Sequence, residues 1–191
     1  NVLGLPLLTI VPKNDSGTVT AISKALRNAK LIIFVSPNAI ECTMRSITDA
    51  GMVWGDLVNA QTRVGVVGSS SREALLRHGV EAGAIVMPAN ASQSDSEGLW
   101  RALQNHIQDW QAYSVVILKG EGGRESLLDH LQAAGAAVEA LSIYTRIPLD
   151  SSSNQWQAVQ GLDANTSLWL LTSSEAVRHL GTILPSFAES H

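Results

Sequence analysis

The sequence predicts an α/β protein with doubly wound parallel sheets, arranged as two domains joined by a two-stranded linker. Short apolar runs alternate with segments whose apolar residues recur at helical spacing, and this order is typical of parallel sheets covered by helices on both faces. Extended segments at residues 5–12 and 138–149 bracket the middle of the chain, as a pair of linker strands would. We therefore expect one complete α/β domain at 13–137 and only part of a second at 150–191, because about 40 residues cannot bury a stable core unaided.

Composition excludes several classes of protein. The chain has 191 residues, of which 45% are hydrophobic, and a formal net charge of −4. The negative charge argues against general nucleic-acid binding, and no apolar run approaches the roughly 18 residues of a membrane span. Cys42 is the only cysteine, which excludes an intrachain disulfide and fits a reducing cytosol. We expect a cytoplasmic monomer whose sequence begins inside a longer gene product, since it lacks both an initial Met and a signal-peptide pattern.

The first half of the chain contains a series of strands and helices. Prolines at both ends of residues 5–12 argue against a helix and against a central strand. Leu31–Val35 is a buried strand, after which Ser36 can cap a helix and Pro37 suits its first position. The other expected elements are a helix over Thr18–Asn28, a polar connection at Trp54–Gln61, a strand over Arg63–Val67, a helix opened by Gly68–Ser71, and a strand over Ala84–Met87.

The second half is organised around a buried strand and a glycine-rich turn. Val115–Leu118 is apolar and β-branched, and Gly120, Gly122 and Gly123 follow where the backbone must turn into a helix. The other expected elements are a helix with Leu99, Leu103 and Ile107 at four-residue spacing, the helix ending at Ala134 before Gly135, an extended run over Ala137–Pro148, a short helix over Trp156–Leu162, a strand over Ser167–Leu171, and a helix that begins at Thr172 with Glu175 in a capping box.

The glycine turn is a candidate anion site. A turn that opens a helix leaves backbone N–H groups unpaired, and the positive end of the helix dipole favours an anion beside them. Glu125 stands where the dinucleotide motif needs its last glycine, and no Gly-Lys-Ser/Thr follows, so a nucleotide is disfavoured. Strand–glycine–helix turns also occur in many α/β proteins that bind nothing there, and that reading remains open.

Three other strand ends carry hydroxyl groups at a helix start. These are Ser36 with Asn38, Ser71 after Gly68, and Thr172 with Ser173 and Ser174. The carboxyl edge of a parallel sheet is where open α/β folds bind ligands, so four donor-rich ends would suit a ligand with many carboxylates. The alternative is that each residue is only a helix cap.

The remaining candidates give weaker signals. The five histidines are scattered without metal-ligand spacing, and no GxSxG elbow is present. Tyr144 ends a predicted linker strand, where a tyrosine can donate a proton or can simply anchor the strand.

These stretches, in this order, resemble the uroporphyrinogen-III synthase family. Residues 116–125, continued by Leu128, Leu131, Gly135 and Tyr144, are similar to the family's strand–Arg-Gly-x-x-Gly-Arg–helix–Gly-Ala–Tyr arrangement. Residues 34–40 resemble its Thr-Ser-x-Asn-Ala-Val turn, residues 171–177 resemble a second copy, and residues 66–74 resemble its Gly-x-x-Thr-Ala segment. In this chain Lys119 stands where the family usually has Arg, Ser71 stands where it has Thr, and the family's first strand and last units are absent.

The resemblance implies a cofactor-free enzyme that closes the linear tetrapyrrole hydroxymethylbilane, a substrate with eight carboxylates, to uroporphyrinogen III with inversion of ring D and loss of water. It implies two α/β domains with the site in the cleft between them, no bound metal, and a transient encounter with the preceding deaminase. By this resemblance Tyr144 assists hydroxyl departure, and the substrate is held by Ser36, Asn38, Ser71, Gly122, Gly123, Thr172, Ser173 and Ser174. A non-catalytic two-lobed α/β module that binds a small anion is the alternative.

Overall fold

The computed structural model of the chain describes residues 3–90, 95–122, 126–160, 162, 167–170 and 173–183, with the backbone alone at 158–160, 174 and 183. These residues form two compact units, residues 12–145 and residues 1–11 with 146–191. Each unit has its own apolar core. None of the helices in the described ranges is long and apolar enough to cross a membrane.

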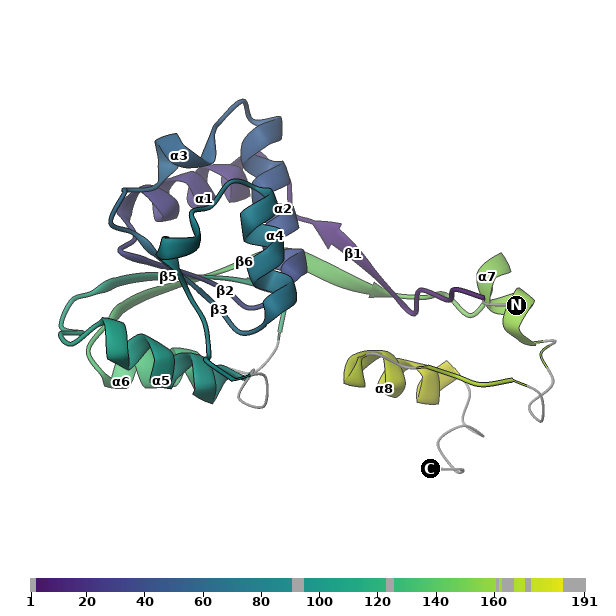
Figure 1. Cartoon of the computed structure of the whole chain (residues 1–191). Coiled ribbons are helices and arrows are strands. Elements are labelled where there is room, and N and C mark those ends of the chain that lie inside the picture. The colour runs from purple at the N-terminus through teal and green to yellow at the C-terminus, as the bar shows by residue number, and fades with distance from the viewer. Residues whose placement is uncertain are drawn as a thin grey trace. The chain divides into compact units, whose positions relative to one another are not determined.

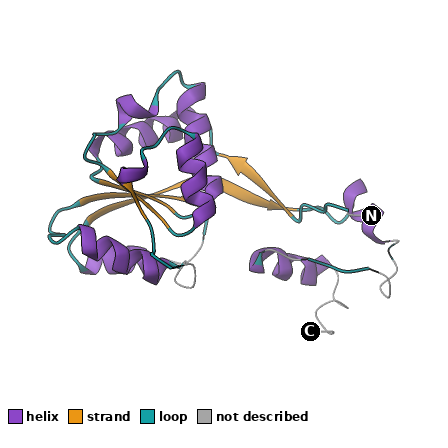
Figure 2. Ribbon diagram, viewed as in Figure 1, coloured by secondary structure: helices purple, strands orange, loops and turns teal. Residues whose placement is uncertain are grey.

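The chain forms a mostly parallel sheet, of which β2 to β5 and most of β6 belong to the larger unit and nearly all of β1 to the smaller one (Figure 2). The strand order is β1-β6-β5-β2-β3-β4. The pairs β2–β3, β2–β5, β3–β4 and β5–β6 are parallel, whereas β1 runs opposite to β6 (Figure 1). The strands are β1 (Leu8–Pro12), β2 (Leu31–Phe34), β3 (Arg63–Val66), β4 (Ile85–Val86), β5 (Ser114–Gly120) and β6 (Ala137–Pro148).

Helices cover both faces of this sheet (Figure 1). One face carries α1 (Ser16–Asn28), α2 (Pro37–Asp49), α3 (Trp54–Leu57) and α4 (Ser69–Arg77), and the other carries α5 (Ser96–His106) and α6 (Ser126–Ala133). A 3₁₀ turn, Ala82–Ala84, precedes β4. The predicted doubly wound α/β architecture is confirmed for this unit.

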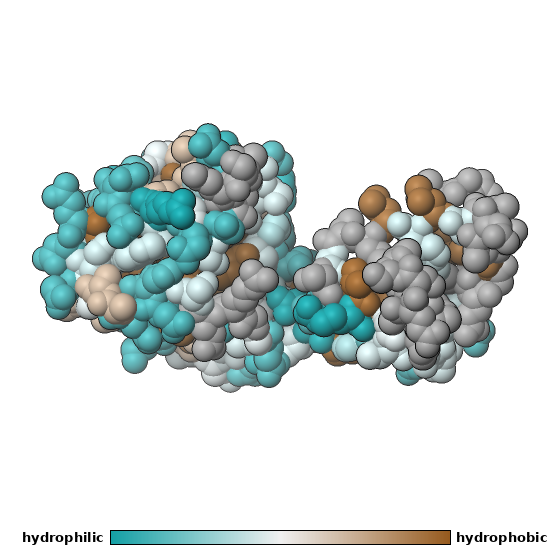
Figure 3. Space-filling view, turned by 90° about the horizontal axis from the view of Figure 1, so that it is seen from below, coloured by the Kyte–Doolittle hydropathy of each residue, from teal (hydrophilic) through white to brown (hydrophobic). Residues whose placement is uncertain are grey.

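Successive side chains of a strand point to opposite faces of the sheet, and helices cover both faces, so a strand can be buried along its whole length. All of β2 is buried, and Leu31 and Ile33 pack with residues of α5 and α6. The predicted face of α5 is confirmed, because Leu99, Leu103 and the C-cap residue Ile107 all belong to that cluster. Seen from below, the outer surface of the α5–α6 layer is mainly hydrophilic (Figure 3), so these helices separate core from solvent.

One predicted connection of the larger unit is wrong, because the segment predicted as a polar link contains the short helix α3. Leu57 of this helix is 1% exposed, and the ring of Trp54 lies against that of Phe34, with 6.2 Å between their centroids. Burial of these apolar groups stabilises a helical turn whose four residues give no periodicity to read.

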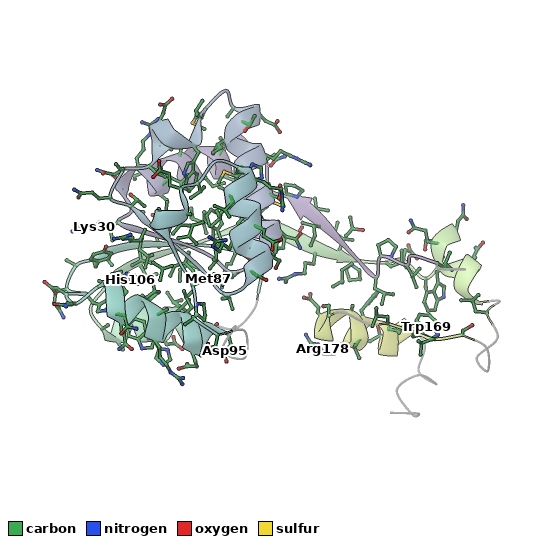
Figure 4. The ribbon with its side chains drawn as sticks, in the orientation of Figure 1. Lys30, Met87, Asp95, His106, Trp169 and Arg178 are labelled. Atoms are coloured by element: carbon green, nitrogen blue, oxygen red, sulfur yellow. The ribbon has the colours of Figure 1, made fainter. Side chains whose placement is uncertain are left out.

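The smaller unit contains α7 (Asn154–Gln160) and α8 (Ser174–Ile183). Its buried residues are Leu7, Trp156 and Leu180, with Trp169 packed against them (Figure 4). The predicted strand over Ser167–Leu171 is wrong for residues 167–170, which form no strand. Leu168 and Leu170 are 98% and 87% exposed, and hydrophobic surface is visible on this unit (Figure 3).

Candidate functional site

The site begins where β2 ends at Phe34. Ser36 is in the extended conformation, with φ −162° and ψ 161°, and its Oγ accepts a hydrogen bond of 3.2 Å from the N–H of Ala39. Pro37 takes the first helical position, where its missing N–H costs nothing. The predicted cap of α2 is confirmed, so one hydroxyl is fixed at the positive end of a 13-residue helix.

Three turns start together at this edge of the sheet. Phe34 of β2 is in register with Val66 of β3 and with Leu118 of β5. Two positions after these three residues in the sequence come Ser36, Gly68 and Gly120. Parallel pairing therefore brings the start of α2, the start of α4 and the glycine turn to one carboxyl edge, the position at which open α/β sheets bind ligands.

Tyr144 of β6 reaches this edge from the neighbouring strand. Its hydroxyl oxygen lies 3.1 Å from Oγ of Ser36, although the two residues are 108 positions apart. The side chain is buried, with 1% of its surface exposed, whereas Ser36 keeps part of its surface in solvent. The structure thus joins two residues that the sequence marked separately.

Tyr144 is placed there by an irregularity in the pairing of β5 and β6. Lys119 pairs with Ser142, but Gly120 pairs with Tyr144, so β6 contains one more residue than β5 at this step. Bulges of this kind re-aim a side chain. The N–H of Glu121 then donates to the carbonyl of Tyr144 at 2.9 Å, which fixes the backbone on both sides of the turn.

Gly120 has a role that the sequence did not indicate. A Cβ at this position would lie 2.5 Å from Cε2 and Cζ of Tyr144 and 2.9 Å from its hydroxyl oxygen. Gly120 was predicted as a turn residue, but its lack of a side chain admits the tyrosine ring. Gly122 is the residue that needs a left-handed backbone, with φ +71°.

Lys13 adds a positive charge at the same edge. Its Nζ lies 3.7 Å from a carboxylate oxygen of Glu121 and 3.4 Å from Oγ of Ser142. Its backbone N–H donates to the carbonyl of Ile143 at 2.9 Å, beside Tyr144. Sequence reasoning missed this residue, because a single lysine after Pro12 carries no spacing signal.

Two ionisable groups of α1 and α2 have shifted pKa values. Hydrogen bonds from the hydroxyl and the N–H of Thr18 lower the pKa of Asp15, the N-cap of α1. Burial raises the pKa of the Cys42 thiol, which is 5% exposed within α2. Cys42 is therefore a packing residue and not a reactive thiolate.

The other predicted site residues of the larger unit take different positions. Asn38 is exposed in the first turn of α2, and Ser71 is buried in the first turn of α4. The N-cap of α4 is Gly68, which makes no side-chain cap, so the expected hydroxyl cap is absent there. The three serines that follow Gly68 are the first residues of the helix itself, so none of them occupies the N-cap position. Gly123 lies outside the described residues.

The predicted residues of the smaller unit form a helix start. Ser173 caps α8, with its Oγ accepting from the N–H of Ala176 at 3.3 Å, and Ser174 is the first helical residue. Thr172 lies outside the described residues. The capping box predicted with Glu175 is not formed, because the cap is Ser173 and the residue three positions on is Ala176. Glu175 instead pairs with Arg146, at 3.3 Å between Oε2 and Nη1.

No three His, Cys, Asp or Glu side chains come together as a metal site within the described ranges. The donors described at the carboxyl edge include hydroxyl groups, backbone N–H groups and the ammonium of Lys13. Such a donor set suits carboxylates, which accept hydrogen bonds from N–H and O–H groups. The Ser36–Tyr144 pair adds two hydroxyl groups able to pass a proton.

Comparison with known proteins gives one consistent result. A sequence model described as uroporphyrinogen-III synthase HemD matches residues 1–191. No curated protein sequence matches the chain. The native uroporphyrinogen III synthase of the extremely thermophilic bacterium Thermus thermophilus is similar in structure, at 15% identity and a TM-score of 0.52 over 74% of this chain and 50% of that one.

Two further structures of the Thermus thermophilus synthase agree. A mutant form is 14% identical, with a TM-score of 0.56 over 75% of this chain and 52% of that one. Another structure is 13% identical, with a TM-score of 0.52 over 74% and 51% of the two chains. At this identity the likeness shows the fold, and the chain spans about half the length of these solved relatives.

Proposed function

The chain belongs to the uroporphyrinogen-III synthase family, and we propose that the protein carrying it converts hydroxymethylbilane to uroporphyrinogen III, with inversion of ring D and loss of water. The family match over residues 1–191 carries this proposal. The hydrogen-bonded pair of Ser36 and Tyr144 supports it, because departure of the substrate's hydroxyl group as water needs a proton.

The substrate's carboxylates set the binding problem. The chain has a net charge of −4, so a broad basic surface does not supply the attraction. Backbone N–H groups and hydroxyls at helix starts can hold carboxylates without one. We assign this role to Ser36, Asn38, Ser71, Gly122, Gly123, Thr172, Ser173 and Ser174, as the resemblance implies.

The proposed reaction needs no cofactor. Loss of water and attack of a ring D carbon on the resulting azafulvene come first. The bridge carbon that joins ring D to its neighbour then leaves that same ring carbon and rejoins the opposite one, which loses its proton. None of these steps changes the oxidation state overall. Acid–base groups and a shaped substrate are sufficient for such steps. Tyr144 is the proposed source of the proton, and most of the acceleration is assigned to holding the linear substrate in a near-closed conformation.

The proposal includes the organisation of the protein. Residues 13–137 would form one α/β domain, residues 5–12 and 138–149 the linker strands, and residues 150–191 part of a second α/β domain. We propose a cytoplasmic monomer that meets the preceding deaminase transiently. The single buried thiol of Cys42 is compatible with that reducing compartment.

A coupled assay tests the function directly. Porphobilinogen and the preceding deaminase generate hydroxymethylbilane, which closes without a synthase to the type I isomer. We expect addition of the complete gene product to shift the porphyrin product to type III, scored after oxidation by chromatography. Exclusive type I product in its presence would reject the proposal, and heat-inactivated protein serves as the control.

A further inference from the structure

We propose that Ser36 delivers the proton to the departing hydroxyl group and that Tyr144 supplies it from behind, through Ser36. This inference rests on the proposed function and deepens it. It starts from the burial of the tyrosine. Tyr144 is 1% exposed, with its ring seated against Gly120. Ser36, whose Oγ is 3.1 Å from the tyrosine hydroxyl oxygen, is only partly buried.

The hydrogen-bonding capacity of Ser36 fits a relay. A serine hydroxyl offers one proton and two lone pairs. The N–H of Ala39 uses one lone pair, at 3.2 Å, because Ser36 caps α2. If the hydroxyl of Tyr144 donates to the second, the proton of Ser36 is directed to a third group. A substrate oxygen in contact with Ser36 can take that place.

The charge left behind is stabilised by the same helix. Transfer of the first proton leaves a transient negative charge on Ser36, and transfer of the second moves that charge to Tyr144. Both oxygens lie at the N-terminus of α2, where the helix dipole and the N–H of Ala39 favour an anion. The N-cap of α2 therefore has a second role, because it orients the relay and stabilises its deprotonated form.

Protons and electrons balance in this step. The C–O bond of the hydroxymethyl group breaks, and its electron pair leaves with the oxygen, which takes the proton of Ser36 and departs as water. The pyrrole nitrogen supplies electrons to form the cationic azafulvene. Ser36 takes the proton of Tyr144, which becomes a phenolate. After the ring closes, the pyrrole carbon loses a proton, which returns through Ser36 to Tyr144.

The test separates the relay from the cap. Ser36→Asn keeps a good N-cap but has no hydroxyl, and Ser36→Thr keeps both. Asp95→Ala is a matched control, because Asp95 caps α5 by accepting from the N–H of Gly98 at 2.7 Å (Figure 4). These variants, Tyr144→Phe and the double variant Ser36→Asn/Tyr144→Phe are assayed in the complete gene product, by kcat and KM for type III formation.

We expect Ser36→Asn and Tyr144→Phe each to lower kcat by about 100-fold, as loss of general acid catalysis does. KM should change little for Tyr144→Phe and only modestly for Ser36→Asn, because the Asn amide keeps a hydrogen-bond donor for the substrate. The double variant should be no slower than the slower single variant, because both remove one relay. Ser36→Thr should keep most of the turnover, and Asp95→Ala should change stability alone.

Multiplied losses in the double variant, or wild-type kcat in Ser36→Asn, would overturn the relay while the proposed function stands. Type I product from the wild-type protein would instead reject the function, and the relay with it.

Discussion

The ring of Tyr144 occupies the space that a side chain on Gly120 would need, since a Cβ built there would lie 2.5 Å from two ring carbons. The two residues are paired across β5 and β6 at the step where β6 carries an extra residue. The position of the tyrosine hydroxyl beside Ser36 therefore depends on a missing side chain in the next strand.

Gly120→Ala should displace the tyrosine ring. Overpacking of this kind costs typically about 1–3 kcal/mol of stability, and we expect a loss of turnover that follows the loss of the Ser36–Tyr144 contact. Urea unfolding and kcat measure the two effects. Gly68→Ala is the matched control, because Gly68 starts the neighbouring turn and a Cβ there meets nothing within 4 Å. Wild-type turnover in Gly120→Ala would contradict the dependence.

Tyr144→Phe should lower turnover more than it weakens binding, because it removes a proton and leaves the packed ring. Affinity for the product, measured by fluorescence, should change little. The chain has two tyrosines, and Tyr113→Phe is the control, since Tyr113 packs on Trp110 and Lys30 instead. Undiminished kcat in Tyr144→Phe would remove the residue from the chemistry.

Gly122→Ala should impair substrate binding through the backbone. The φ of Gly122 is +71° and a Cβ would meet no neighbour, so the expected cost of about 1–2 kcal/mol is conformational. Gly122→Asn should cost less, because Asn tolerates this region better. Gly79→Ala shares the positive φ and the open surroundings, and should lose stability without a change in KM. An equal KM effect in both alanine variants would argue against a binding role for the glycine turn.

Lys13→Met should raise KM for the linear tetrapyrrole by about two- to fivefold, the effect of one partly exposed ion pair, with kcat nearly unchanged. The side chain of Lys13 is 33% exposed and lies beside that of Glu121. The backbone N–H of Glu121 donates to the carbonyl of Tyr144. Lys30→Met is the control, because Lys30 precedes β2 and so lies at the opposite edge of the sheet. A KM equal to that of wild type would exclude a carboxylate contact at Lys13.

Acid should weaken the contact between α2 and the end of α4. The hydrogen bond from His78, and then that from Arg77, lower the pKa of Glu41 from its ordinary 4.5. Because the folded pKa is the lower one, the stabilisation is complete above pH 4.5 and is lost as the pH falls through the lowered value.

Glu41→Gln should therefore reduce stability at neutral pH by about 0.2–1 kcal/mol and flatten the acid part of the unfolding profile. Glu139→Gln, at an exposed position of β6, is the comparison. If stability fell equally with decreasing pH in Glu41→Gln and in the wild-type protein, the contribution of Glu41 would be contradicted.

The sequence was sufficient for the larger unit because its strands are apolar runs and its helices begin at recognisable residues. The cap at Ser36, the central position of β5 and the stop at Gly135 follow from local chemistry. The short helix α3 was not predicted from the sequence. It is stabilised by the contact of Trp54 with Phe34, and a contact between residues far apart in the sequence leaves no local pattern.

The site was predicted residue by residue but not as an arrangement. Ser36 and Tyr144 were both identified, yet their contact depends on the strand order β6-β5-β2 and on the bulge, and neither has a sequence signature. For the same reason Gly120 was assigned to a turn. Only the fold shows that a tyrosine 24 positions later fills the space beside it.

The bulge in β6 also makes strand length a constraint distinct from residue type. An extra residue opposite a single partner bends the strand and re-aims the side chain beside it. Deletion of Ile143 would remove the extra residue between Ser142 and Tyr144, so regular pairing of Tyr144 with Gly120 would lose the local bend that aims the tyrosine ring. A conservative substitution at Ile143 would leave this frame intact. The geometry of the site thus depends partly on the number of residues in β6, and not only on which residue stands at each position.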